Sequence, residues 1–481
     1  MSFEATGPTS VERITAPEQP AGVVESRFLG RLEFRGGYPT EATLQELYDR
    51  LDFQRGCQAF LRHIMAAAVW GFYRGLTRDL GMAVNELAVL HLDANGLLLT
   101  GNSETIYGIA ILDTKPGPLV VEVPPRVLGL LNDQWMRPMG DLGIAGPDRG
   151  AGGKYLLLPP GYDEEVPDGY VEAIRLRTYR QWLVMRAFMG SGGDAAPGTQ
   201  ALLATRIYPL AQEDDPPASR NADVSGKPFD TIHPTDVRYF EDLAEMVEYE
   251  PLEAISLEES AELAQLGIEK GKPFAPDERL RGILDEAAKV GGFMAFSLAN
   301  APRVDYLRYP DRQWYGNIAG YPGFVDEQGR PMIDAMVEMA WFATGRAQAM
   351  GSERVGVGSA YTWAYRDRNA EWIDPARTYK LRLPGPIPAK DFWSVVVYDL
   401  WTRSMLANGQ PFPSLNSYSH GLEPDDDGGV TVYIGPQPPE GKEGNWIRTL
   451  PEVGWFPLIR LYGPLETWID RSWKPDDIEE V

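Results

Sequence analysis

Two long stretches of this chain consist of short apolar runs cut by turns. The first covers about residues 90–188 and the second about residues 379–462. Short apolar runs bounded by Gly, Pro, Asn and Asp are typical of β-strands. The 50 glycines and 40 prolines make up about a fifth of the chain, against a usual ~12%, so many turns are expected. The pattern therefore predicts two β-rich units.

Helical periodicity marks three other stretches. Apolar residues recur every three or four positions through residues 41–79, which predicts N-terminal helices. Residues 236–289 combine apolar residues at helical spacing with many carboxylates between them. This pattern is typical of amphipathic helices with one solvated face. One more helix is expected at residues 333–350. Together with the β-rich stretches, these helices predict a mixed α+β fold.

The same patterns divide the chain into four parts. Residues 1–38 are expected to form a flexible lead, and residues 39–210 the N-terminal helices with the first β unit. A loop-rich crossing at residues 189–230 suggests the boundary near 210. Residues 211–350 are then a region of loops and acidic helices, and residues 351–481 form the C-terminal β unit.

The charge of the chain excludes two classes of partner. It carries 45 basic and 69 acidic residues, a net charge of −24. This excess repels phosphate backbones and anionic lipid, so neither a nucleic acid nor a membrane is expected as a partner. The longest apolar run, residues 64–73, has about half of the ~20 residues that a membrane crossing needs. The segment from Met1 to Pro17 shows no export signal, so a cytoplasmic location is expected.

The sequence motifs that would indicate a metal or nucleotide site are incomplete in this chain. Cys57 is the only cysteine and is expected to be an ordinary buried thiol. Residues 150–154 resemble a phosphate loop, but Tyr155 replaces its Ser or Thr, and residues 356–361 lack the third glycine of a dinucleotide loop. The four histidines are scattered, and residues 425–427 favour a solvated hairpin turn over a calcium loop. No metal site is predicted and no cofactor is assigned.

A first polar cluster occurs where a β run begins, at residues 102–107. Glu104 is a candidate acid or base there, and Asn102, Thr105 and Tyr107 are candidate ligand-binding residues in a cleft. The alternative is structural: Asn102 and Thr105 would satisfy backbone groups in a turn, and Glu104 would face water.

Two further segments, near the C-terminus, mix polar and aromatic residues. Asp399 is a candidate catalytic carboxylate and Arg403 a candidate binding residue; alternatively the two form a structural ion pair. The long polar loop at residues 408–420 offers His420 as a catalytic imidazole, with Asn416 and Tyr418 as binding residues. A purely structural loop is the alternative.

The segments that hold these residues resemble a known pair of families. Residues 47–60, 102–107 and 152–161 are similar to the domain of unknown function 1254, and residues 267–277 are the most specific match. The C-terminal half resembles the usual partner of that domain, the domain of unknown function 1214. The residues that carry this second resemblance are Phe392-Trp393-Ser394, Tyr398-Asp399, Lys442, Asn445-Trp446 and residues 458–464.

The resemblance implies a fold and an assembly state. The fold is α+β, with two β-sandwich-like (jelly-roll-like) units and helical segments at the N-terminus and between them. A homo-oligomer is also implied, whereas no reaction and no cofactor are. Glu104 stands where the family pattern has an aspartate, and the residues before Tyr418 differ from its Asn-Pro-x-x-Arg-Tyr pattern, so a shared site would be altered here.

Two classes of function follow from these observations. The first is an enzyme, of the hydrolase or lyase type, that acts on a small organic molecule in a cleft between the two β units. The second is a non-catalytic ligand-binding or oligomeric assembly protein, with carbohydrate binding among its forms because 13 tryptophans are present.

Overall fold

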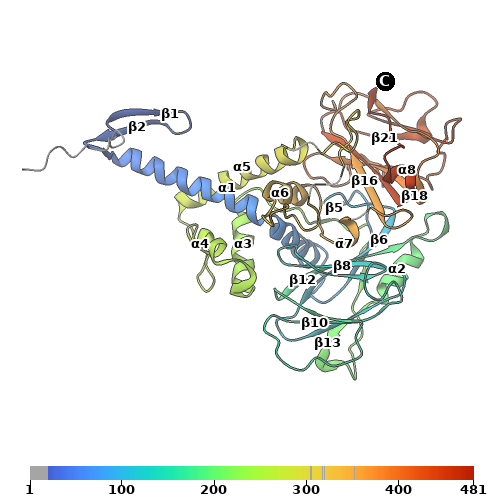
Figure 1. Cartoon of the computed structure of the whole chain (residues 1–481), viewed down its shortest axis with the longest axis horizontal. Helices are drawn as coiled ribbons and strands as arrows, with labels where there is room; N and C mark the ends of the chain where they lie inside the picture. The colour runs from blue at the N-terminus through green and yellow to red at the C-terminus, as the bar shows by residue number, and fades with distance from the viewer. Residues whose placement is uncertain (1–19, 304–305, 317, 319, 352) are drawn as a thin grey trace, which may run out of the picture.

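The protein is an elongated molecule in which a narrow arm extends from a larger body (Figure 1). The computed structural model describes residues 20–303, 306–316, 318, 320–351 and 353–481. Helices lie N-terminal to and between two β regions, which confirms the predicted α+β class.

One long helix joins the arm to the body. Helix α1 (Glu41–Arg74) has 34 residues, which gives a length of about 51 Å. It begins after Thr40, whose side chain accepts a hydrogen bond from the amide of Thr43. Its first half is largely exposed, whereas Ile64 to Phe72 is buried. A π-helical turn, Gly75–Asp79, completes the helical segment predicted for residues 41–79.

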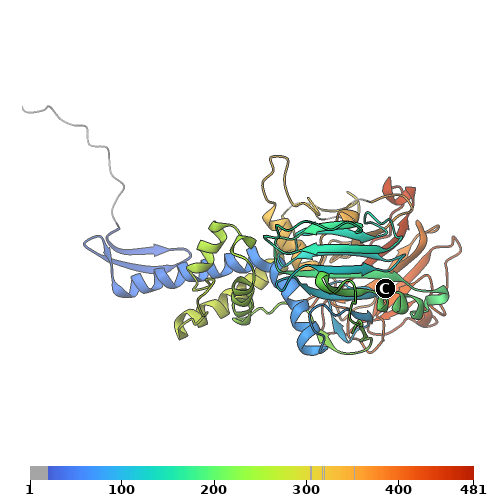
Figure 2. The same cartoon turned by 90° about the horizontal axis from the view of Figure 1, so that it is seen from below.

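The arm ends in a small antiparallel sheet. Strands β1 (Gly22–Ser26), β2 (Gly30–Arg35) and β3 (Tyr38–Pro39) pair in that order. Figure 2 shows this sheet beside the exposed end of α1, away from the body. Residues 1–19 of the expected flexible lead lie outside the described residues, but the rest of it forms these strands, because residues 22–26 pair with residues 30–34.

Two sheets with a shared core form the N-terminal β region. The core contains buried side chains of both sheets, among them Ile106, Val121, Tyr155 and Leu183. The six-stranded sheet has the order β14 (Ala222–Asp223), β4 (Ala88–His91), β6 (Thr105–Asp113), β12 (Arg180–Phe188), β8 (Leu128–Asp133) and β9 (Pro138–Gly143). The four-stranded sheet has the order β11 (Glu172–Arg175), β10 (Gly153–Leu158), β7 (Leu119–Val123) and β13 (Arg206–Pro209).

Two four-stranded sheets form the C-terminal β region, again around one core, which includes Leu381, Val395, Val432 and Ile459. The first has the order β16 (Ser359–Trp363), β22 (Trp455–Pro464), β18 (Ala389–Asp399) and β19 (Ser414–Asn416). The second has the order β21 (Trp446–Arg448), β20 (Val430–Gly435), β17 (Tyr379–Leu383) and β23 (Glu479–Glu480).

The acidic central region is helical, as predicted. It contains α3 (Arg238–Tyr249), α4 (Leu257–Ala264) and α5 (Glu278–Asn300). Helix α5 packs closely along α1, because a Cβ atom on Gly56 would lie only 2.7 Å from that of Ala287. Among the described residues, no helix combines the length and apolar composition that crossing a membrane requires.

The helix predicted at residues 333–350 is shorter than expected. Helix α6 (Ile333–Phe342) ends at Phe342, and only a short turn of helix, α7 (Gln348–Gly351), follows. Between them the backbone of Arg346 bonds to the side chain of Asn132 on β8, through N to Oδ1 at 2.8 Å and Nδ2 to O at 2.7 Å. These two bonds hold the segment as extended chain beside the six-stranded sheet. As a consequence, Ala343 and Thr344 line a cavity between the two β regions.

Candidate functional site

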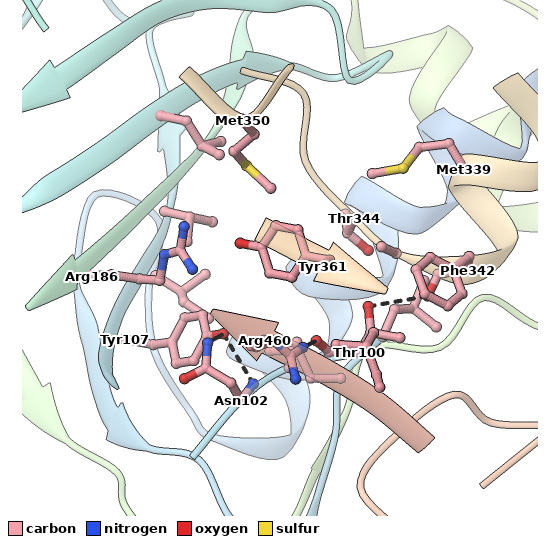
Figure 3. Close-up of a pocket in the computed structure, with 18 of the residues that line it drawn as sticks. Thr100, Asn102, Tyr107, Arg186, Met339, Phe342, Thr344, Met350, Tyr361 and Arg460 are labelled. Atoms are coloured by element: carbon pink, nitrogen blue, oxygen red, sulfur yellow. Dashed lines mark hydrogen bonds between the residues drawn. The ribbon is translucent and has the colours of Figure 1, made fainter. Parts of the chain in front are cut away.

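A cavity of about 150 Å³ lies where the two β regions and the segment after α6 meet. Its wall takes residues from β6 and β12 of the first region and from β16 and β22 of the second. Figure 3 shows these side chains around the cavity.

Most of the wall is apolar and aromatic. Phe72 and Trp182 lie with ring centroids 4.6 Å apart, and Phe342 and Trp363 stack at 4.5 Å. No Asp or Glu occurs among the described residues that line the cavity. The charged side chains of the wall are two arginines, Arg186 and Arg460.

Asn102 organises the entry into β6. Its Oδ1 accepts hydrogen bonds of 3.0 Å from the amides of Glu104 and Thr105, and its Nδ2 donates to the Tyr107 hydroxyl at 2.8 Å. The turn therefore fixes the position of Tyr107, whose side chain reaches the cavity (Figure 3). Burial raises the pKa of Tyr107, and the positive charges of Arg186 and Arg460 oppose the rise.

Arg460 is buried and already has partners in the protein. Its Nη1 donates to the hydroxyl of Tyr398 at 2.6 Å, and its Nη2 donates to the carbonyl oxygen of Thr100 at 2.5 Å. Arg460 therefore holds β22 to the loop that precedes β6, and it contributes a fixed positive charge to the wall.

Arg186 and Tyr361 face each other across the junction of the two β regions. Figure 3 shows the Tyr361 hydroxyl directed toward the guanidinium of Arg186. Burial alone would raise the pKa of Tyr361. The charges of Arg186 and Arg460, with hydrogen bonds from Ser359 and Arg186, outweigh burial and leave the pKa of Tyr361 below its ordinary value. Among the described residues, Arg186 makes no salt bridge with any carboxylate.

A second, larger cavity of about 490 Å³ adjoins the first. The residues that line both are Leu130, Val184, Arg186, Met350 and Tyr361. Arg186 and Tyr361 therefore stand at the boundary between an inner and an outer cavity. In the outer cavity Asp141 accepts a hydrogen bond of 3.2 Å from the amide of Ala349, which anchors α7.

The first predicted cluster lies at or beside this site. Asn102 and Tyr107 line the inner cavity, whereas Thr105 lines a small neighbouring pocket of about 50 Å³. Glu104 is buried rather than facing water. Its Oε1 accepts a hydrogen bond of 2.9 Å from Ser103, and its Oε2 has no hydrogen-bond partner among the described atoms.

Asp399 and Arg403 lie together at the end of β18 but not in the wall of the inner cavity. Asp399 accepts hydrogen bonds from the amides of Trp401 at 2.8 Å and Thr402 at 2.6 Å, so it closes the turn. Arg403 donates to the carbonyl oxygen of Trp341 at 2.8 Å. No salt bridge joins Asp399 and Arg403 among the described residues, but the charge of Asp399 acts on Arg403 and opposes the lowering of its pKa by burial.

The polar loop at residues 408–420 lies apart from the inner cavity wall. Asn416 is half-buried and accepts a hydrogen bond of 2.8 Å from the amide of Tyr418. Tyr418 packs against Phe392 with ring centroids 5.4 Å apart, and His420 is exposed. The three side chains thus form a surface loop beside β18.

Three residues of the cavity wall were not predicted from the sequence: Arg186, Tyr361 and Arg460. Two of them could have been found, because each arginine interrupts a run of buried strand residues. An arginine inside an apolar strand is unusual, since its charge must be compensated when it is buried. Within the described residues, no three His, Cys, Asp or Glu side chains gather in a way that could hold a metal ion.

Two family models match the chain, and they confirm the predicted pairing. Residues 84–209 match "Protein of unknown function (DUF1254)", and residues 358–466 match "Protein of unknown function (DUF1214)". No curated protein matches the chain.

Two solved structures resemble this one. The crystal structure of the VPA0106 protein from Vibrio parahaemolyticus has 17% sequence identity and a TM-score of 0.54, and covers 89% of this chain and 100% of its own. An uncharacterised protein from Burkholderia cenocepacia has 14% identity and a TM-score of 0.41, and covers 90% of this chain and 96% of its own. The first likeness shows a shared fold.

Proposed function

For a chain that carries a DUF1254 region followed by a DUF1214 region, we propose that the inner cavity between the two regions binds a small organic molecule. One observation carries the proposal: Tyr107 and Arg186 from the first region and Tyr361 and Arg460 from the second line the same cavity. Mostly apolar cavities with a few converging polar groups are the usual form of small-molecule sites.

The size of the cavity sets the size of the molecule. An apolar protein cavity of about 150 Å³ admits a benzene ring, and the inner cavity has a similar volume. The aromatic pairs Phe72–Trp182 and Phe342–Trp363 give it flat walls. A single ring, or a chain of about six carbons, therefore suits the inner cavity.

Chemistry of the hydrolase or lyase type is the second step of this proposal. Such chemistry needs a group that takes or gives a proton beside the substrate. Tyr361 is the wall residue with a lowered pKa, and Glu104 is a buried carboxyl group two residues beyond Asn102. Tyr361 therefore supports an acid–base role at the cavity, whereas Glu104 does not line the cavity and would have to act from beside the wall.

A cavity-filling variant tests the binding step. Ala343 lines the cavity, so Ala343→Phe should remove bound molecules from the native mass spectrum and abolish ligand-induced changes in tryptophan fluorescence. Ala376→Phe, at an exposed position, is the matched control and should behave as wild type. Unaltered ligand binding by Ala343→Phe would contradict the proposal.

Self-association is a second candidate function, favoured by the arm. Its apolar side chains are exposed, with Phe28 81% and Tyr38 78% accessible, and β1 is an open sheet edge. Such edges pair readily with another chain. The hairpin carries Arg27, Arg31 and Arg35 against two glutamates, whereas residues 236–289 have six basic and fifteen acidic residues. This complementarity favours a second copy of the chain as the partner.

A further inference from the structure

We propose that the ligand of the inner cavity is an organic monocarboxylate, whose carboxylate binds Arg186 and Tyr361 while its apolar body fills the inner cavity. This inference rests on the proposed function and names the substrate class for the same site.

The first support is the charge of the wall. The chain as a whole carries a net charge of −24, yet the described wall of the inner cavity has two guanidinium groups and no carboxylate. The charge of Glu104 acts on Arg460, whereas the groups that act on the half-buried Arg186 are tyrosine hydroxyls. A partly buried cation without a carboxylate partner is costly. An anionic ligand would supply the missing negative charge.

The second support is the difference between the two arginines. Arg460 already donates to Tyr398 and Thr100. Three phenols, those of Tyr361, Tyr107 and Tyr462, act on Arg186, and Tyr361 is the one hydrogen-bonded to it. A guanidinium has five N–H donors in a planar fork, so Arg186 has donors left for a ligand. The fork matches the two oxygens of a carboxylate.

The third support is position. Arg186 and Tyr361 line both the inner and the outer cavity, so their polar groups stand between an apolar chamber of about 150 Å³ and a wider one of about 490 Å³. A molecule with one charged end can enter through the outer cavity, place its apolar body among Trp182 and Phe342, and keep its carboxylate at the boundary. A dicarboxylate would place a second charge against the apolar wall, which is unfavourable.

The probes are two carboxylates and their neutral isosteres. Phenylacetate and hexanoate are compared with phenylacetamide and hexanamide by tryptophan fluorescence and calorimetry at pH 7. Charge-assisted hydrogen bonds contribute about 1.5–3 kcal/mol, which corresponds to roughly 10- to 100-fold in affinity. The wild-type protein should therefore bind each carboxylate at least about tenfold more tightly than its amide.

Two arginine variants locate the effect. Arg186→Gln should lower carboxylate affinity by about tenfold or more and leave amide affinity within about twofold. Arg177→Gln, which changes an exposed arginine that lines neither cavity, should leave both unchanged. Should Arg186→Gln fail to fold, Tyr361→Phe tests the same contact and should lower carboxylate affinity by about threefold or more.

The outcomes separate this inference from the proposed function. Equal affinity for acid and amide, both abolished by Ala343→Phe, would overturn the carboxylate inference and keep the binding function. Binding that Ala343→Phe does not change, or no binding of any of the four probes, would overturn both.

Discussion

Arg460 on β22 donates a hydrogen bond of 2.6 Å from Nη1 to the hydroxyl of Tyr398 on the neighbouring strand β18. Tyr398 in turn donates to the carbonyl oxygen of Gly101, and Arg460 also reaches that of Thr100. The pair therefore ties the C-terminal sheet to the loop that carries Asn102. It is a structural link of the site, whereas Arg186 is the arginine that we propose binds the ligand.

Removing this link should destabilise the protein. Arg460→Leu leaves the Tyr398 hydroxyl without its donor and the Thr100 carbonyl unpaired in a buried place, so the free energy of unfolding should fall by about 3 kcal/mol. Tyr398→Phe loses the bond from Arg460 and the bond to Gly101 but leaves Arg460 its bond to Thr100, so it should cost less, about 1–2 kcal/mol. Urea unfolding measures both. Losses below about 0.5 kcal/mol for both variants would contradict the structural role.

Glu338 on α6 should make stability fall as pH rises. Burial raises the pKa of Glu338 to about 9, and the neighbouring carboxylate of Asp334 adds to the rise. The folded protein therefore holds a proton that the unfolded chain releases above its ordinary pKa of about 4.3. The contribution to stability is complete below that pH and is lost as the pH rises toward 9. The slope is at most about 1.4 kcal/mol per pH unit.

The Glu338→Gln variant isolates this effect. Glutamine cannot ionise, so the free energy of unfolding should fall less between pH 5 and pH 8 than in the wild type, in urea titrations at each pH. Burial also raises the pKa of Glu250 to about 7 and lowers that of His63 to about 4 and that of His233 to about 3. The contributions of these groups have opposite signs and are the same in both proteins, so the difference between wild type and variant reports Glu338. Glu371→Gln, at an exposed position, is the control. Equal slopes for wild type and Glu338→Gln would refute the prediction.

The catalytic roles predicted for Glu104, Asp399 and His420 can be tested once a substrate is found. We expect the largest effect at Glu104, because it is buried with one unpaired carboxyl oxygen, whereas His420 is exposed and Asp399 closes a turn. Glu104→Gln should lower kcat by about 100-fold if the group transfers a proton. Unchanged turnover in folded Glu104→Gln and His420→Ala would remove both from the mechanism.

The arm should control the association state. Phe28→Ser combined with Tyr38→Ser removes the two most exposed aromatic side chains of the arm. We expect this double variant to be monomeric by light scattering at a concentration where the wild type is a homo-oligomer, with an unchanged circular dichroism spectrum. A monomeric wild type would rule out assembly through the arm. Val355→Ser, an exposed apolar position outside the arm, is the control.

Local patterns predicted much of the fold. Tyr379, Leu381 and Leu383 alternate with charged residues, and β17 spans these residues. The end of α6 was predicted wrongly, because the two bonds from Asn132 that extend the chain come from a strand about 200 residues earlier. The arm sheet was missed because its strands are short and exposed, so they lack the alternating burial that marks a strand.

The site was predicted only in part, because most of its residues are brought together by contacts between segments that are distant in the sequence. Asn102 and Tyr107 belong to one local segment with a visible polar cluster, and both line the cavity. Arg186, Tyr361 and Arg460 come from three strands that are distant in the sequence. Their meeting depends on the packing of the two β regions, which periodicity does not describe.

The spread of the cavity wall along the chain has a consequence for synthesis on the ribosome. Phe72, Ile109 and Trp182 are made early, but Tyr361 and Arg460 follow much later. A nascent chain that ends near residue 350 therefore presents an unfinished apolar wall to water, the kind of surface that attracts chaperones and other nascent chains. The cavity closes only when β22 takes its place between β16 and β18.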